Sequence, residues 1–515
     1  MGIHDYIIIG GGISGLFMAY KLSETNKDIV LIESTNRLGG RLFTDHQKGV
    51  QFELGAARLS SKHTKLISLI KEFNLNEDLI KLPDTINYKI KGPRINFYSL
   101  VKELIDGSKL YTKKYLQSVN LLQVSIDILG QTNAMLLKDM LGYDSEFYKL
   151  NSSIALKTFK KDLFSANDYY VLKNGFSSLV SKMEEYLRSK SNITILLDSR
   201  VTDIGKNFVQ MDKQKRYGGT ILCCIPPQAA MSLSKLRSIP EIKQTTPIPL
   251  IRIYAKYPKD KQGNVWFQGI NQTITDNYIR HIIPIDYENG LIMISYTDGE
   301  YANMWRDLSQ ISEKVLVEHL HKEVTNVLGK RPPKPEFVRS YYWSGGVHMW
   351  KPGIHVEKTY ESIMKPFEHE KIYMINEAYS LHQSWVEGAL DMCYDVLTKL
   401  DNSFKRGIPK KQKVKKNKIY TIQDVLKKRN WIVMDVRGKL RIYDVGKWLK
   451  DHPGGSSNLR RGIEANKYYL DKQKYPKSPI QLFKQIEKHS MGNVINTMLF
   501  KENKYVKFIG IMKKV

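Results

Sequence analysis

The chain is poor in cysteine and contains no long uninterrupted run of apolar residues. It has 3 cysteines among 515 residues, too few for a disulfide scaffold, and no Cys/His spacing that indicates zinc. Two of them, Cys223 and Cys224, follow an apolar run and are expected in the core. No apolar stretch reaches the roughly 18 to 20 residues that span a bilayer, and no secretory leader precedes the first apolar run. We therefore expect a soluble, cytoplasmic protein without a transmembrane segment.

Acidic residues are scarce in the last fifth of the chain. The whole protein carries a formal charge of +28. From residue 405 onward there are 29 Lys or Arg and only 8 Asp or Glu, whereas the first 404 residues have a basic surplus of 7. Such a field attracts acidic proteins, nucleic acid or an anionic membrane surface. A solvated, lysine-rich surface without a partner is the alternative.

Length and pattern predict more than one domain. The chain is too long for one ordinary core, and 42% hydrophobic and 10% aromatic residues are typical of a globular protein. Residues 100–190 have mostly helical apolar spacing, whereas residues 247–297 contain short β-rich runs bounded by turn residues. Residues 404–418, with eight basic residues and no acid, predict a linker. A separate small domain is expected over residues 419–515.

The first 33 residues contain a dinucleotide-binding pattern. Gly10, Gly12 and Gly15 form G-x-G-x-x-G after an apolar run, and Glu33 ends the next apolar run. Glycines let the backbone turn tightly and approach a pyrophosphate at a helix N-terminus, and the acid accepts hydrogen bonds from ribose hydroxyls. Because strand, helix and acid all fall where this mechanism needs them, a turn that binds no dinucleotide is a poor explanation of the glycine pattern.

The stretch after Glu33 narrows the choice of dinucleotide. It completes E-x-x-x-R-x-G-G-R and resembles the flavin amine oxidase family, as do VLKNGFSSLV, SRVTDI and INEAYSLHQSWVEGAL. The resemblance implies a doubly wound, Rossmann-like α/β FAD-binding domain (about 1–75, 190–245 and 335–403) with an inserted α+β substrate domain (about 76–190 and 246–335). It assigns the FAD contacts to Gly10, Gly12, Ile13, Ser14, Gly15, Glu33, Ser34, Gly40, Arg41, Gly55, Ala56, Ala57, Arg58, Val201, Glu377, Ser384, Trp385, Val386 and Ala389.

Two departures from the family pattern concern the flavin ring. WSGGVHMW has Val347 where monoamine oxidases carry the cysteine that bonds to the flavin, which predicts non-covalent FAD. The family usually has a lysine facing the reactive flavin nitrogen, and PIPLIRIYAKYP has Arg252 at that place. Lys256 shares its strand face by two-residue alternation and is the second candidate for the catalytic position.

The stretch FELGAARLSSKHTKLISLIKEFNL resembles the L-amino-acid oxidase branch of the family. The branch binds the substrate carboxylate with the arginine of G-x-x-R, which corresponds to Arg58. A guanidinium suits a carboxylate because two parallel hydrogen bonds fix its orientation. Pairing of Arg58 with a protein acid or with the cofactor is the alternative. The branch also has a tyrosine that helps to hold the carboxylate, and Ile283 stands there instead, with Arg280 and His281 nearby.

The resemblance also implies the reaction. Trp385 falls where the family places an aromatic wall beside the amine, and His348 or Trp350 is expected to supply the other wall. Hydride transfer from the carbon bearing the amine to the flavin gives an imine, which water hydrolyses to a keto acid or aldehyde and ammonia. The electrons then pass to O2, giving hydrogen peroxide, or to another redox acceptor.

The C-terminal segment resembles cytochrome b5. IYDVGKWLKDHPGG places His452 at the position of one axial haem ligand, and His489 in EKHSMGN is the candidate for the second. The resemblance implies haem b and a small α+β fold, although 37 residues separate the two histidines, more than is usual in that family. An insertion between them can be looped out at modest entropic cost. A haemless binding module is the alternative.

Three functions therefore remain open for the whole chain. The leading interpretation is oxidation of an L-amino acid or related primary amine, with the fused haem as a further electron acceptor, and polyamine or monoamine oxidation is a variant of it. The second is a flavoprotein with a basic module that binds an acidic partner or nucleic acid, in which salt-sensitive binding is expected. The third is a flavin-binding protein with little turnover, because Arg252 replaces the lysine.

Overall fold

The structure, a computed structural model, forms two compact units, Met1–Lys405 and Arg406–Val515. It describes residues 3–83, 85–163, 168–212, 214–401, 419–436, 439–449, 460, 463–464 and 507–512. Among these residues, none of the helices combines the length and the apolar composition needed to cross a bilayer.

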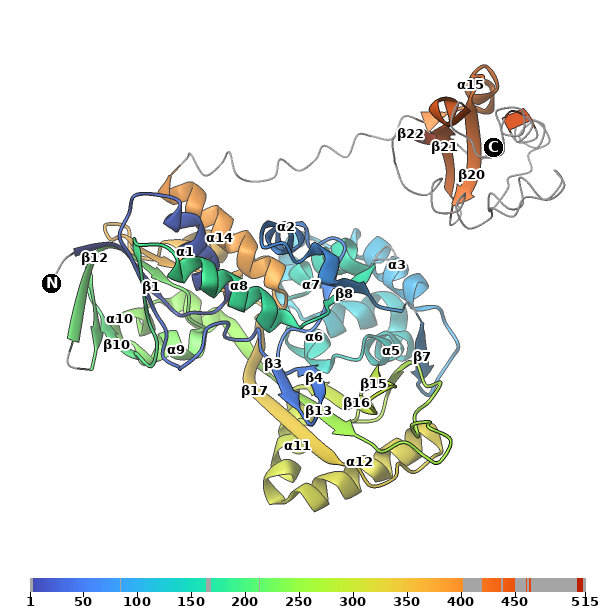
Figure 1. Cartoon of the computed structure of the whole chain (residues 1–515), viewed down its shortest axis with the longest axis horizontal. Coiled ribbons are helices and arrows are strands. Elements are labelled where there is room, and N and C mark those ends of the chain that lie inside the picture. The colour runs from blue at the N-terminus through green and yellow to red at the C-terminus, as the bar shows by residue number, and fades with distance from the viewer. Residues whose placement is uncertain are drawn as a thin grey trace. The chain divides into compact units, whose positions relative to one another are not determined.

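A seven-stranded sheet contains the first strand of the chain (Figure 1). Its order is β10-β11-β12-β1-β2-β9, with β18 beside β12. Strands β2, β1, β12, β9 and β18 pair in parallel, and the last three residues of β1, Ile7 to Ile9, are buried, which explains the apolar run that ends the strand. The bounds are β1 Ile3–Ile9, β2 Ile29–Ile32, β9 Ile193–Leu196, β10 Val201–Ile204, β11 Phe208–Met211, β12 Gln214–Cys223 and β18 Ile372–Met374.

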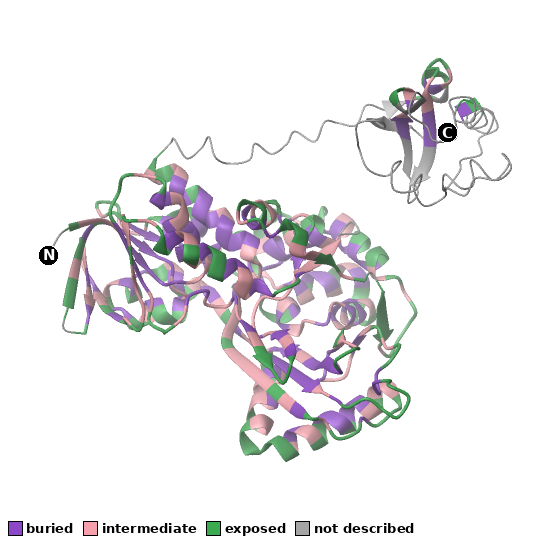
Figure 2. Ribbon diagram, in the orientation of Figure 1, coloured by how far each residue is buried: buried purple, intermediate pink, exposed green. Residues whose placement is uncertain are grey.

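Three helices from distant parts of the chain pack together over this sheet: α1 (Ile13–Ser23), α8 (Phe176–Arg188) and α14 (Val386–Leu400). Figure 2 shows buried residues concentrated along α1 and α14. The residues of this α/β layer are not contiguous in the sequence, because strand β18 and helix α14 come from residues 372–400, far from β1 and α1. The pattern of strand, glycine turn and helix predicted at the N-terminus is confirmed.

A second sheet has six strands, in the order β17-β13-β16-β15-β14-β7. Helices α11 and α12 cover it, and Trp305 of α11 is fully buried in their shared core. The bounds are β7 Ile86–Lys89, β13 Thr245–Lys256, β14 Gln272–Thr275, β15 His281–Asp286, β16 Leu291–Asp298, β17 Phe337–Trp350, α11 Gly299–Ile311 and α12 Glu313–Leu328.

The connection between the two sheets is mostly helical, as expected, but it contains strand β8 (Tyr169–Leu172). This strand pairs with β5 (Leu59–Ser60) and β6 (Leu79–Lys81), so the helical expectation fails there because the partners lie about a hundred residues upstream. A hairpin of β3 (Thr44–Gln47) and β4 (Val50–Glu53) precedes it. The helices of this connection are α2 Thr64–Glu72, α3 Phe97–Ser108, α4 Lys113–Ser118, α5 Leu121–Leu141, α6 Asp144–Lys149 and α7 Ser152–Thr158. Helices α9 (Pro227–Ser232) and α10 (Ser234–Arg237) follow β12, and α13 (Val356–Met364) lies between β17 and β18.

The C-terminal unit contains a four-stranded sheet in the order β19-β22-β21-β20. Its helix α15 (Ile422–Leu426) begins with a capping box, in which Thr421 and Asp424 exchange side-chain and backbone hydrogen bonds. The strands are β19 Ile419–Tyr420, β20 Trp431–Val436, β21 Lys439–Asp444 and β22 Lys507–Met512. The two histidines expected to bind haem, His452 and His489, lie outside the described residues.

Candidate active site

The glycine turn after β1 brings the start of α1 against the end of the strand. Gly10 has φ +100°, and a Cβ there would lie 2.8 Å from the carbonyl oxygen of Cys224. A Cβ on Gly15 would lie 1.9 Å from the carbonyl oxygen of Gly10, so this approach requires glycine. On Gly12 a Cβ would meet nothing within 4 Å. This open side, together with the N–H groups of α1 from Ile13 onward, fits a pyrophosphate.

Glu33 lies beside this turn, at the end of β2. Its Oε2 accepts a hydrogen bond from the Gly11 N–H at 2.7 Å, and its Oε1 accepts one from the Thr35 N–H at 2.9 Å. The hydroxyl of Ser34 also donates to Oε1 at 3.3 Å. The carboxylate is thus fixed next to the glycines, where a ribose hydroxyl can donate to it.

The residues around Arg41 close over the same turn. Gly40, at φ +56°, packs so closely on Gly12 that a Cβ on Gly40 would lie 3.2 Å from its Cα. Gly55 crosses the backbone of Arg41, where a Cβ would lie 1.9 Å from the Arg41 carbonyl oxygen, and the Ala56 N–H donates to that oxygen at 2.9 Å. This crossing sets the start of the segment that continues through Ala57 to Arg58.

Arg41, Glu377 and His348 form a group that we call the clamp. Nη1 of Arg41 donates to Glu377 Oε2 and to the Gly346 carbonyl oxygen, both at 2.8 Å. The His348 ring bonds to Glu377 through Nδ1 at 3.2 Å and to Gln228 through Nε2 at 3.1 Å. Burial opposes ionisation of Glu377, but Arg41 and His348 outweigh it and lower its pKa to about 2. Glu377 is therefore an anion held entirely by protein groups.

His348 thus lies in the clamp, where its pKa is lowered mainly by burial. The other aromatic candidate, Trp350, is fully buried and donates its ring N–H to the Ser380 carbonyl oxygen at 2.8 Å. Both positions follow from the length of β17: it pairs with β13 from Phe337 to Trp350, with one irregularity in the register, and its C-terminal end reaches the clamp. The structure places neither ring among the contacts of Trp385.

A strained turn leads from the clamp to Trp385. Ser384 has φ +70°, rare for a residue with a side chain, and its N–H donates to Glu377 Oε1 at 2.7 Å. Trp385 follows as the residue before α14. The remaining predicted cofactor contacts are distributed over three elements: Ser14 on α1, Val201 at the start of β10, and Val386 and Ala389 on α14.

Glu387 of α14 fixes α2 against this turn. Its two carboxylate oxygens accept from the N–H groups of Lys65 and Leu66, at 3.0 and 2.9 Å, and so cap the N-terminus of α2. His63, the residue before α2, is thereby placed edge-on to Trp385 with the ring centroids 4.7 Å apart. Burial lowers the pKa of His63 to about 3, so its ring is neutral.

Arg58 lies in an aromatic group that includes Trp385, which we call the Arg58 cluster. Its Nη2 donates to the Tyr143 hydroxyl at 3.2 Å, and its guanidinium lies 5.3 Å from the centroid of the Tyr169 ring. Tyr169 in turn stacks on Trp385, with centroids 6.4 Å apart and planes 23° apart. Within the described part of the chain, Arg58 makes no ion pair with a carboxylate. The alternative in which it pairs with a described protein acid is therefore wrong.

Arg252 adjoins this cluster through Tyr296. Its guanidinium lies 4.7 Å from the centroid of the Tyr296 ring, which meets Tyr143 edge-on at 5.5 Å. Nη1 of Arg252 also donates to the carbonyl oxygen of Glu53 at 3.0 Å. Arg252 is thus a buried cation beside the predicted substrate site.

Lys256, the second candidate for the catalytic position, lies about 13 Å further along β13 than Arg252, since a strand rises about 3.3 Å per residue. Its ammonium pairs with Glu336 at 3.1 Å and donates to the Lys48 carbonyl oxygen at 3.2 Å. The described contacts of Lys256 therefore belong to the far end of the strand and not to the Arg58 cluster.

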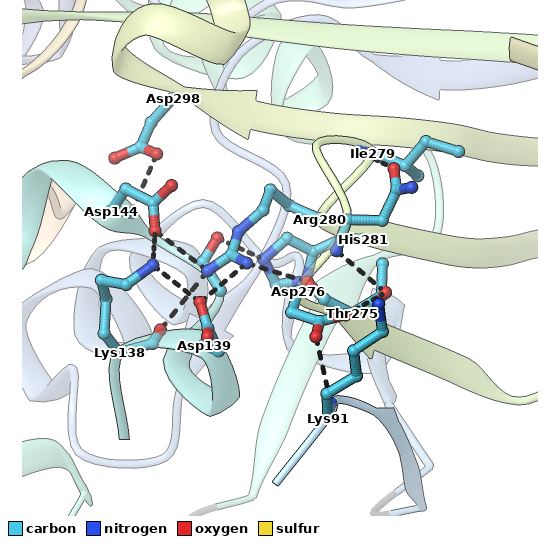
Figure 3. Close-up of polar contacts among 12 residues, drawn as sticks. Lys91, Lys138, Asp139, Asp144, Thr275, Asp276, Ile279, Arg280, His281 and Asp298 are labelled. Atoms are coloured by element: carbon cyan, nitrogen blue, oxygen red, sulfur yellow. Dashed lines mark hydrogen bonds and ion pairs between the residues drawn. The ribbon is translucent and has the colours of Figure 1, made fainter. Parts of the chain in front are cut away.

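Figure 3 shows a network of ion pairs around Arg280 and Asp144, the residue after Tyr143. Arg280, fully buried and at φ +59°, donates to Asp139 at 3.2 Å and to Asp144 at 3.0 Å. Lys138 bonds to the same two carboxylates at 2.7 and 2.9 Å. Asp144 directly follows Tyr143, so two cations and two anions anchor the tyrosine that contacts Arg58.

His281 supports the same tyrosine, with its ring centroid 4.9 Å from that of Tyr143. Ile283, at the place of the family's carboxylate-binding tyrosine, instead packs against the core around Phe52 and Tyr254. The phenol that contacts Arg58 therefore comes from Tyr143, in the connection between α5 and α6. Sequence reasoning missed Tyr143 and Tyr169 because neither belongs to a motif.

Three side chains of the types that can ligate a metal ion lie together near Trp385. His63, Asp162 and His382 are buried, and one ligand atom of each lies within 4.8 Å of the others. His382 Nε2 lies 2.8 Å from Asp162 Oδ2, and its Nδ1 lies 2.9 Å from the ammonium of Lys161. Because the ammonium can only donate, Nδ1 accepts and Nε2 carries the proton toward Asp162. This hydrogen-bonded pair opposes metal ligation by His382.

The sequence matches a known family over most of its length. Residues 13–391 match the model of the flavin containing amine oxidoreductases, and the chain belongs to that family. The protein is therefore an oxidoreductase, and FAD is the cofactor that the family implies. The glycine turn, Glu33 and the clamp fit that cofactor. The match ends before the linker and the C-terminal unit.

Individual relatives are distant. The L-amino acid oxidase of Cerastes cerastes is 22% identical over 452 residues, covering 75% of this chain and 84% of the relative. Achacin of Lissachatina fulica is 21% identical over 486 residues, covering 75% and 91%. A redesigned double mutant of putrescine oxidase superposes with a TM-score of 0.62 at 14% identity, covering 77% of this chain and 98% of that structure. At this identity the structural likeness concerns the fold.

Proposed function

We propose that the protein oxidises the amino group of an L-α-amino acid with non-covalent FAD. The observation that carries the proposal is Arg58: a guanidinium in an aromatic group, bonded to a phenol and without a carboxylate partner among the described residues. A guanidinium fork binds a carboxylate with two parallel hydrogen bonds. The similarity to L-amino acid oxidases supports the same substrate class.

Each residue of the site has a separate role. Bound FAD would accept the hydride from the carbon that carries the amino group. Arg58 holds the substrate carboxylate, and Tyr143 holds Arg58. Tyr169 and Trp385 form an aromatic wall that excludes water from the amine. Water hydrolyses the imine product to a keto acid and ammonia, and O2 takes the electrons as hydrogen peroxide.

Anaerobic reduction tests the proposal. The visible absorption of the purified, FAD-loaded protein is recorded before and after addition of L-amino acids, with D-amino acids and with putrescine and cadaverine as controls. We expect the flavin bands to bleach with L-amino acids only. Bleaching by the amines and not by L-amino acids would overturn the proposal in favour of amine or polyamine oxidation. Absence of bleaching with every substrate would favour a flavin-binding protein without turnover.

Haem b in the C-terminal unit is a separate proposal, supported by the sequence pattern around His452 and His489 alone. No step above is assigned to it. Protein expressed with a haem precursor should show a Soret band that is lost in the double variant His452→Ala, His489→Ala. A fully FAD-loaded protein without that band would overturn it. An acidic or nucleic-acid partner for the basic C-terminal unit likewise stays a prediction, tested by salt-dependent binding.

A further inference from the structure

Arg252 is a second guanidinium, besides that of Arg58, that has no carboxylate partner among the described residues. Its side chain is buried, with 9% of the residue exposed. Glu53 gives Arg252 only its carbonyl oxygen, because its carboxylate accepts the Phe176 N–H at 2.6 Å and the Thr44 hydroxyl at 3.1 Å. Since an isolated buried charge is costly, the site calls for an anion that this part of the chain does not supply.

The strand register fixes the direction in which Arg252 points. Strand β13 lies between β16 and β17, and Arg252 is paired with Tyr296 on one side and with Tyr341 on the other. Directly opposed residues of antiparallel strands place their side chains on the same face of the sheet. Ile251 and Ile253, the neighbours of Arg252 in β13, are fully buried against α11 and α12 on the opposite face. Arg252 therefore points away from the helices, between two phenols.

Two tyrosines connect Arg252 to Arg58. The Arg252 guanidinium lies 4.7 Å from the centroid of the Tyr296 ring, and that ring meets Tyr143 edge-on at 5.5 Å. The Tyr143 hydroxyl in turn accepts a hydrogen bond from Arg58 at 3.2 Å. Arg58, Tyr143 and Tyr296 are all half-buried, so each keeps accessible surface. The two guanidiniums thus lie at opposite ends of one pair of phenol rings.

The acids of the adjoining elements do not neutralise these two charges. Asp298 of β16 accepts the N–H groups of Asp144 and Ser145. Glu146, three residues after Tyr143 in α6, forms no ion pair with a described arginine. Because a guanidinium stays protonated at every pH at which the protein is folded, a ligand meets two fixed positive charges.

A substrate with two carboxylates matches both charges. In the proposed function the α-carboxylate binds Arg58, and the amino group lies beside the wall of Tyr169 and Trp385. The side chain is then the part of the substrate that extends toward Tyr296 and Arg252. A carboxylate at its end would form the charge-assisted hydrogen bonds that a guanidinium prefers. An amide or an apolar end would leave Arg252 without an anion.

We propose that Arg252 binds the side-chain carboxylate of the substrate, so that the preferred substrates are the acidic amino acids L-glutamate and L-aspartate. The proposal rests on the proposed function, since it places the α-carboxylate on Arg58. It assigns Arg252 a role in specificity and none in the hydride transfer. A contact of Arg252 with FAD is the competing role that the experiments must separate.

Isosteric substrate pairs test the proposal. L-glutamate and L-glutamine have nearly the same shape and differ in charge, as do L-aspartate and L-asparagine, and we expect the wild type to favour the acidic member of each pair in kcat/KM. In Arg252→Met, kcat/KM for the acidic member should fall roughly 10- to 100-fold, the range of a lost charge-assisted hydrogen bond, while the amide member stays within about threefold. Arg252→Lys keeps the charge and should recover part of the preference. Arg188→Met, which breaks an exposed pair with Glu184, is the matched control and should change neither.

Binding without turnover separates specificity from a structural role. Glutarate and valerate have the same chain length and carry two carboxylates and one, and the flavin absorption of the FAD-loaded protein reports their binding. We expect the wild type to bind glutarate about tenfold more tightly than valerate or better, and Arg252→Met to bind both equally. The visible absorption also gives the FAD content of each variant.

Three outcomes would overturn the proposal: no preference for the acidic substrates and glutarate in the wild type, an equal fall for acidic and amide substrates in Arg252→Met, or loss of FAD from Arg252→Met. The last would assign Arg252 to the cofactor. If neutral L-amino acids are oxidised, these outcomes leave the proposed function standing. If no L-amino acid is oxidised, both fail.

Discussion

The clamp and the Arg58 cluster differ in whether their charged side chains form ion pairs with other protein groups. In the clamp, the Glu377 carboxylate is bonded to Arg41, His348 and the Ser384 N–H. In the Arg58 cluster, Arg58 bonds to the Tyr143 hydroxyl and forms no ion pair with a carboxylate of the described residues. A fully paired buried network stabilises one conformation. Charges left without protein partners are instead available to a ligand that comes and goes, so the difference separates the groups that maintain the fold from those that bind substrate.

The largest expected effect comes from breaking the clamp. Glu377→Gln removes the buried anion and leaves the half-buried Arg41 beside a neutral amide, which should lower the free energy of unfolding by about 3 kcal/mol, the lower end for a broken buried pair. Urea unfolding at pH 7 measures the loss, with and without FAD. Glu185→Gln, in an exposed pair with Lys182, is the control and should cost at most about 1 kcal/mol. Equal stability of Glu377→Gln and wild type would contradict the comparison.

Substitution of Arg58 should lower the activity and leave the free energy of unfolding unchanged. Arg58→Met removes the bidentate donor for a carboxylate, and we expect kcat/KM for L-amino acids to fall about 100-fold or more, with most of the loss in KM. Arg58→Lys keeps the charge but not the planar fork, so it should restore only part of the activity. Because Arg58 has no described carboxylate partner, neither variant should lose the stability that Glu377→Gln loses. A matching loss in urea unfolding would show that the two regions do not differ.

Glu146 should affect the pH dependence of stability. Its pKa rises on folding from 4.5 to about 8 because of burial, so the folded protein keeps a proton that the unfolded chain releases. The associated stability is present below pH 4.5 and is lost as the pH rises through 8. Glu146→Gln should remove this part of the decline and be the more stable protein at pH 8.5. Chemical unfolding at intervals from pH 5 to pH 8.5 measures it, and parallel curves for both proteins would contradict the assignment.

The smallest effect should come from Lys256. Its ion pair with Glu336 is partly exposed, and such pairs contribute about 0–1 kcal/mol. Lys256→Met should therefore change the free energy of unfolding by no more than this and leave kcat/KM within about twofold. A large loss of activity with intact FAD binding would return Lys256 to the candidate catalytic residues.

The sequence predicts the glycine turn better than the substrate side. Gly10, Gly15 and Glu33 belong to a strand, a turn, a helix and a second strand that follow one another in the chain, so a local pattern suffices to find them. The Arg58 cluster joins Tyr143, Tyr169 and Trp385, which come from three distant segments. Only Arg58 and Trp385 belong to a motif, so tertiary packing decides the rest.

Tertiary packing also decides the strand and the helices that the sequence did not predict. Residues 337–350 form one continuous strand, β17, although GG and a Trp-rich pattern obscure its alternation, because β13 lies beside it over its whole length. Helices α11 and α12 follow the β-rich residues 247–297 and are set by burial on the six-stranded sheet.

The pairing of β18 with β12, and of α14 with α1, has a consequence for biosynthesis. The sheet that begins with β1 receives strand β18 only after residues 372–374 are made, and α14 ends at Leu400. During translation, the nascent chain therefore keeps the unpaired backbone edge of β12 and an apolar face of α1 uncovered while more than a hundred further residues emerge. Such long-range closure slows folding and exposes the intermediate to aggregation.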